Sequence, residues 1–114
     1  MRSLLLATAF FVSSIVVAQA GDIMASRYGN TTITTDANGN STHLYYKADG
    51  TFTGKQGDAA FKGTWKMDGA NVCLTAEPAI PNTPNPACAP ASAHAVGDSW
   101  QAGPYKVSLV KGIQ

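Results

Sequence analysis

The sequence predicts an all-β protein, an antiparallel meander of roughly six or seven short strands that forms a small barrel or a strongly curled sheet. Three observations support this prediction. Between residues 44 and 74, segments rich in aromatic residues, Thr and Val alternate with turns that contain Gly. Residues 61–67 alternate between apolar or small side chains and polar ones, as in a half-buried strand. Residues 21–114 contain no segment that is long and periodic enough to predict a helix.

The predicted domain begins with residues 21–29, which lack a strong period and are expected to form a flexible tail. Residues 30–35 follow, and their Thr content favours a strand. Ile33 is the only large apolar residue of this strand, so it is expected to anchor the strand in the core. A turn is predicted over residues 36–40, with Gly39 at the position that favours a left-handed backbone.

The strand predicted over residues 41–47 has one apolar and one polar face. Leu44 and Tyr46 are expected to point inwards, and the solvent face carries His43, Tyr45 and Lys47. Further strands are predicted over residues 51–55, 61–67, 71–76, 99–102 and 105–110, and the turns between the earlier ones contain Asp49-Gly50, Gly57-Asp58 and Asp68-Gly69.

The side chains expected inside the sheet are numerous enough for one hydrophobic core. They are Ile33, Leu44, Tyr46, Phe52, Phe61, Trp65, Val72, Leu74, Trp100, Val107 and Leu109. Gly63 lies between two of these residues, Phe61 and Trp65. It is expected to mark a β-bulge or a place where a neighbouring ring lies over the backbone.

The segment from residue 77 to residue 98 contains five prolines, and no strand is predicted there because Pro removes backbone donors. Its part 78–90 is either a preorganised recognition loop or a stiff connection across the end of the sheet. Cys73 and Cys88 are the only cysteines, and in an oxidising compartment they are predicted to form a disulfide. Closing a loop of about 15 residues stabilises a fold by about 3 kcal/mol in the chain-entropy model.

Residues 1–20 have the pattern of a secretory signal peptide. Arg2 gives a positive start, residues 4–18 are uncharged and too short to cross a bilayer, and Ala18-Gln19-Ala20 matches a cleavage site. We therefore expect a periplasmic or secreted protein with no stable membrane anchor after cleavage. Residues 21–114 are expected to form a single β domain.

The charge of residues 21–114 is close to zero, because seven Lys and Arg residues balance seven Asp and Glu residues. Without a basic patch, nucleic acid is not expected as a partner. The partners that remain are a protein or a small apolar ligand, and a monomer is expected.

The sequence contains no catalytic constellation, and the chain is predicted not to be an enzyme. It lacks the G-x-S-x-G turn that exposes a nucleophilic Ser, and Asp36, Asp49 and Asp68 occupy turn positions. His43 and His94 lack the spacing of metal ligands and are expected at the surface, so neither a metal nor a cofactor is predicted.

Two groups of residues are candidates for binding. Tyr46, Trp65 and Trp100 are expected either to fill the lumen of the barrel or to line a ligand cavity. A lumen above about 300 Å³ would favour a ligand carrier, and a filled barrel with a projecting loop would favour a protein partner. On the solvent face, His43, Tyr45 and Lys47 combine rings with a cation, which suits a partner surface as well as an ordinary solvated face.

Residues 46–74, with the segments YKADGTFTG and FKGTWKMDGANVCL, resemble small secreted bacterial lipocalin-like domain proteins. The resemblance implies a compact β-barrel-like fold and export, without an assigned activity. Bacterial metalloprotease inhibitors with a lipocalin-like barrel are similar in size, in G-x-W use and in their single disulfide. This similarity implies an alternative function, a periplasmic inhibitor of a hydrolase of the protease or lysozyme class. Such an inhibitor would act through residues 22–26 or loop 78–90, although the Pro-rich loop between the cysteines departs from those inhibitors.

Overall fold

The computed structural model describes residues 22–114, and the predicted signal peptide lies outside the described residues. Eight strands form one antiparallel sheet in the order β6-β5-β4-β3-β2-β1-β8-β7. The strands are β1 (Thr31–Thr35), β2 (Ser41–Tyr46), β3 (Thr51–Gln56), β4 (Ala59–Asp68), β5 (Asn71–Glu77), β6 (Ala87–Pro90), β7 (Ser99–Ala102) and β8 (Tyr105–Val110). The predicted all-β antiparallel fold is confirmed.

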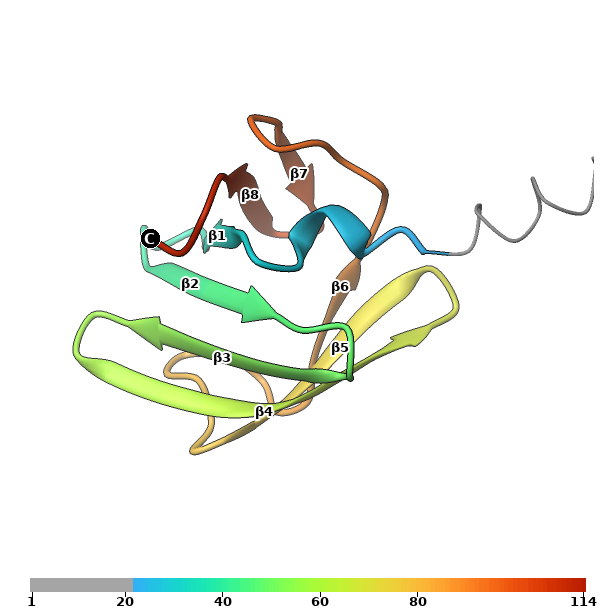
Figure 1. Cartoon of the computed structure of the whole chain (residues 1–114). Helices are drawn as coiled ribbons and strands as arrows, with labels where there is room; N and C mark the ends of the chain where they lie inside the picture. Colours follow the sequence, from blue (N-terminus) through green and yellow to red (C-terminus); the bar gives the residue numbers. More distant parts are fainter. Residues whose placement is uncertain (1–21) are drawn as a thin grey trace, which may run out of the picture.

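The sheet curls into a nearly closed barrel, with β6 and β7 as its two edges (Figure 1). The two edges come close to each other at one end. Gly103 directly follows β7, and a Cβ atom placed on it would lie 3.4 Å from Cδ of Pro90, the last residue of β6. No strand pairing joins β6 to β7. The barrel therefore keeps a seam along which its interior is not closed by backbone hydrogen bonds.

The register of β1 places Thr32 and Thr34, rather than Ile33, inside the barrel. Thr32 is paired with Leu44 on one side and with Leu109 on the other, and all three are buried. Ile33 is paired with His43 and Ser108, and directly opposite residues share one face of a sheet. The prediction that Ile33 anchors β1 in the core is therefore wrong, because pairing with both neighbours fixes the register more strongly than one apolar side chain does.

Tight turns connect β3 to β4 and β4 to β5, as the sequence predicts. Gly57 and Gly69 have φ values of 58° and 61°, which Gly adopts without steric cost. Gly63 lies opposite Phe52 and Ala76 within the sheet, and a Cβ atom there would overlap the carbonyl oxygen of Thr75. The close neighbour expected at Gly63 is thus a strand backbone and not an aromatic ring.

The Pro-rich segment contains strand β6, which was not predicted. Cys88 on this strand lies opposite Cys73 on β5, and the two residues form the predicted disulfide. Because β6 is an edge strand, Pro90 removes no ladder bond from a second neighbour. The loop before β6 is held down by buried Ile80 and by Asn85, whose side chain bonds both the N–H and the carbonyl oxygen of Ala76. The loop is therefore fixed to the barrel at these two residues, while Pro78, Ala79, Asn82, Pro84 and Pro86 are exposed.

The segment predicted as a flexible tail is packed against the barrel. It forms a 3-10 helical turn, Ala25–Arg27, and Met24 just before it is buried in the hydrophobic core. The core also contains the predicted inward residues Leu44, Tyr46, Phe52, Phe61 and Leu74, with Trp65 and Val72 half-buried at its margin.

Candidate functional site

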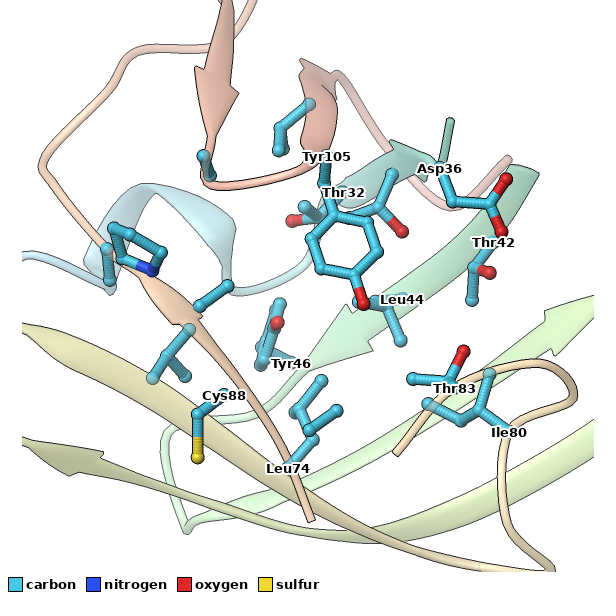
Figure 2. Close-up of a pocket in the computed structure, with 18 of the residues that line it drawn as sticks. Thr32, Asp36, Thr42, Leu44, Tyr46, Leu74, Ile80, Thr83, Cys88 and Tyr105 are labelled. Carbon is cyan, nitrogen blue, oxygen red and sulfur yellow. The ribbon is translucent and has the colours of Figure 1, made fainter. Parts of the chain in front are cut away.

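A cavity of about 80 Å³ lies inside the barrel (Figure 2). Its walls come from β1, β2, β5, β6, β7 and β8, and the 78–86 loop adds Ile80 and Thr83. Leu44, Leu74 and Val107 supply apolar surface. The ring of Tyr105 also points into this space (Figure 2). The cavity is therefore mostly apolar, with a limited number of polar groups.

One end of the cavity carries polar side chains that already bind one another. The carboxylate of Asp36 accepts hydrogen bonds from the backbone N–H groups of Asn38 and Asn40, both at 2.9 Å. The bonds from Asn40 are the largest cause of a lowered pKa for Asp36. Nε2 of Gln56 donates to Oγ1 of Thr42 at 2.9 Å. These groups are satisfied without a ligand.

Successive inward residues of β2 lead away from this polar end. Thr42 is paired with Thr34 near the polar end, Leu44 is paired with Thr32 further in, and Tyr46 is the last inward residue of the strand. The ring of Tyr46 is buried. Along β2 the cavity wall thus changes from polar to apolar and ends at a phenol.

Arg27 lines the cavity close to Tyr46, and its side chain is almost completely buried, at 4 % exposed. Nη1 donates to the carbonyl oxygen of Ile23 at 2.9 Å, and Nη2 donates to that of Ser92 at 3.0 Å. The guanidinium also lies 5.4 Å from the centre of the Trp100 ring, within the range of a cation–π interaction. Burial lowers the pKa of Arg27, because a charge taken out of water loses hydration.

The positive charge of Arg27 has no counter-ion within residues 22–114, where no carboxylate oxygen lies within 4.0 Å of the guanidinium. Its hydrogen-bond partners are neutral carbonyl groups. A second polar group inside the barrel lacks a hydrogen bond: buried Oγ1 of Thr32 has no partner in the described part of the chain. Both residues line the same cavity.

Burial raises the pKa of Tyr46 to about 12, and the nearby charge of Arg27 opposes this shift. Because the unfolded phenol ionises near pH 10, the stability of the fold is expected to fall as the pH rises from about 10 to about 12, by up to about 1.4 kcal/mol per pH unit. Absorbance at 295 nm should show Tyr46 ionising last among the tyrosines. A Tyr46→Phe variant should lose this last step, and an unchanged titration curve would contradict the assignment.

In the loop between β6 and β7, hydrogen bonds link the side chains of Ser92, His94 and Asp98. Nε2 of His94 lies 2.9 Å from Oγ of Ser92, and Nδ1 lies 3.4 Å from a carboxylate oxygen of Asp98. The His94 ring stacks on Trp100 with 3.5 Å between ring centres and 7° between planes. Nη2 of Arg27 donates a hydrogen bond to the carbonyl oxygen of Ser92, and the hydroxyl of Ser26 donates one to the carbonyl oxygen of His94. This cluster therefore fastens the loop and the 3-10 turn to each other.

The six predicted binding residues separate into two groups. Tyr46 and Trp100 line the cavity. Trp65 packs edge-on against Tyr46 and donates its indole N–H to the carbonyl oxygen of Lys47, and it is not part of the cavity wall. The remaining side chains lie outside the lumen: Tyr45 donates to the carbonyl oxygen of Gln114, Lys47 is exposed, and half-buried His43 leaves its Nδ1 unpaired.

Sequence reasoning missed Arg27 and Thr32 as cavity residues. Arg27 lies in a segment without a period, and Thr32 lies on the face of its strand opposite to Ile33, which was expected to point inwards. The alternation of residues 105–110 does place Tyr105 on the inner face.

No helix within residues 22–114 is long and apolar enough to cross a membrane. No group of three or more His, Cys, Asp or Glu residues in this part of the chain is arranged to hold a metal ion. Comparisons with protein-family models, curated proteins and solved structures found no match.

Proposed function

We propose that the chain is an exported, non-enzymatic β domain that binds a small ligand in the lumen of its barrel. The observation that carries this proposal is the cavity beside Arg27, where a buried cation lacks a counter-ion and buried Thr32 lacks a hydrogen-bond partner. Buried polar groups in folded proteins are almost always paired. An apolar cavity with a few convergent polar groups is the usual form of a small-molecule site.

The size of the cavity restricts the ligand. At about 80 Å³ it is smaller than the roughly 300 Å³ that would favour a ligand carrier, so the volume does not support the proposal, which depends on the buried polar groups of the wall. A site of this volume replaces only a few water molecules, since each water needs about 10–15 Å³ of such space. The proposed ligand is therefore a compound of few heavy atoms and not a long lipid.

The alternative function, inhibition of a hydrolase, depends on residues 22–26 or on loop 78–90 reaching a partner. Both segments are packed against the barrel, with Met24 and Ile80 buried. Ser26 is tied to the carbonyl oxygen of His94. Because both segments are tied to the barrel at these residues, the geometry favours the small-ligand proposal, and inhibition stays a prediction.

The hydrogen bonds of Ser92, His94 and Asp98 follow the order found in serine hydrolases, so the proposal of a non-enzymatic domain needs its own test. The three residues lie within one short loop, and the His94 ring is held by stacking on Trp100. We expect a fluorophosphonate reagent to leave Ser92 unmodified, as measured by mass spectrometry of the intact protein. Labelling that disappears in Ser92→Ala would contradict the non-enzymatic assignment.

Export is supported by the Cys73–Cys88 disulfide, since such bonds persist in oxidising compartments. The signal-like pattern of residues 1–20 points the same way. Mass spectrometry of the protein recovered from the producing cells should show a chain that begins at Gly21, and an uncleaved chain would contradict export through this signal.

Ligand binding can be tested by blocking the cavity. Butanol, butyramide and butyrate serve as probes, with binding measured by calorimetry. The Ala102→Leu variant adds volume to a buried wall residue and should abolish the binding of whichever probe the unmodified protein takes up. Ala60→Leu makes the same change at an exposed position of β4 and should leave binding unchanged. If no probe binds, or if Ala102→Leu binds as well as Ala60→Leu, the proposal is wrong.

A further inference from the structure

We infer that the lumen selects a small monoanion, a short-chain carboxylate whose charge is neutralised by Arg27. This inference rests on the proposed function and names the chemical class of its ligand. It starts from Arg27, the buried cation of the cavity wall; the other charged residue of the wall, Asp36, lies at the polar end, where its carboxylate already accepts hydrogen bonds from Asn38 and Asn40.

A buried guanidinium is costly unless a negative charge accompanies it. Arg27 is 4 % exposed, and its two hydrogen bonds end on the neutral carbonyl groups of Ile23 and Ser92. Those two bonds use only part of the guanidinium, which carries five N–H donors. Within residues 22–114 no carboxylate lies close enough to form an ion pair with it. An anion in the adjoining cavity would supply the missing charge.

Hydroxyl groups near Arg27 suit the oxygen atoms of such an anion. Tyr46 lines the same cavity as Arg27 with its ring buried, and the charge of Arg27 opposes the rise of the Tyr46 pKa. Thr32, on the neighbouring strand, has a buried Oγ1 without a partner. A carboxylate accepts several hydrogen bonds, so it can accept from hydroxyl groups of the cavity wall as well as from the guanidinium.

The walls favour a carboxylate with a short apolar chain over a phosphate. Leu44, Leu74 and Val107 line the space between Tyr46 and the polar end. An aliphatic chain would cover these side chains, which a phosphate ion cannot do. A single guanidinium also balances one negative charge and not two. The small volume and the polar groups at Thr34 and Thr42 limit the length of the chain.

Butyrate and butyramide provide the decisive comparison, because they have nearly the same shape and differ in charge. Calorimetry on the unmodified protein should show butyrate binding at least about tenfold more tightly than butyramide. Inorganic phosphate should bind more weakly than butyrate. Arg27→Gln should remove the preference for butyrate, and Arg27→Lys should retain part of it. Lys106→Gln removes the same charge from the exposed surface of β8 and should leave the preference unchanged.

The possible outcomes separate this inference from the proposed function. Equal affinity of the unmodified protein for butyrate and butyramide would overturn the selection of an anion and leave ligand binding in the lumen intact. Phosphate binding more tightly than butyrate would overturn the carboxylate assignment. Failure of all probes to bind would overturn both proposals. The comparison of the two compounds on the unmodified protein decides the matter even if Arg27→Gln does not fold, which circular dichroism would show.

Discussion

The Phe52→Ala variant should lose about 3–5 kcal/mol of the free energy of unfolding, the largest effect expected from a single substitution in this domain. Phe52 is 1 % exposed and packs between two other rings, with centroids 6.4 Å from Tyr46 and 6.3 Å from Phe61. Truncation leaves a void that strands fixed in a sheet cannot collapse to fill. Urea unfolding followed by circular dichroism measures the change.

The Val96→Ala variant is the control for Phe52→Ala. Val96 is an exposed apolar residue, at 43 %, in the loop before β7. Its truncation should change the free energy of unfolding by no more than about 0.5 kcal/mol. Equal urea midpoints for the two variants would show that Phe52 is not in the core of the folded protein.

Removal of the disulfide should have the second largest effect on the free energy of unfolding. The double variant Cys73→Ser, Cys88→Ser is expected to lose about 3 kcal/mol, because a closed loop of this length restricts the unfolded chain by about that amount. The bond joins directly opposite residues of β5 and β6, and β6 has no second strand neighbour. For a domain of this size the loss is a large fraction of a total stability of about 5–14 kcal/mol.

The Cys73→Ser, Cys88→Ser variant should also bind ligand more weakly than the unmodified protein. Ala87 and Ala89 of β6 form part of the cavity wall, and β6 depends on β5 alone for its position. The stabilisation by the disulfide can also be measured without substitution, by urea unfolding of the unmodified protein with and without a thiol reductant. If reduction leaves the midpoint unchanged, the disulfide does not hold the edge of the barrel.

Much of the sheet can be predicted because its signals are local. The alternation of Phe61, Trp65 and their polar neighbours specifies the two faces of β4, and the Gly-containing turns specify its connections to β3 and β5. Side chains of turn residues complete the pattern, as when the carboxylate of Asp49 accepts hydrogen bonds from the N–H group and the hydroxyl of Thr51. These features depend on residues that are close in the sequence.

Features that depend on distant residues were not predictable. Strand β6 forms in a Pro-rich segment because Cys88 is tied to Cys73 and because an edge strand tolerates Pro. The face of β1 is determined by pairing with both β2 and β8, so a Thr-rich strand turns Thr32 inwards and Ile33 outwards. Neither outcome has a signature within the segment itself.

Only part of the candidate site could be inferred from the sequence. Tyr46 and Trp100 were identified because large aromatic residues on inward faces usually fill or line a barrel. Arg27 was not, because its environment comes from Ser92 and Trp100, which follow it by more than 60 positions. A buried cation produces no periodic pattern, so its role becomes visible only when the barrel closes around it.

The most direct test of the account is a map of amide chemical shifts during titration with butyrate, using uniformly ¹⁵N-labelled protein. Binding in the lumen predicts that the largest changes occur at Arg27, Thr32, Tyr46 and Trp100. The outer-face residues Tyr45, Lys47 and Lys62 should remain unchanged. If the largest changes instead occur on that outer face, the barrel interior is not the binding site, and if the lumen residues do not respond at any butyrate concentration, the lumen does not bind a short-chain carboxylate.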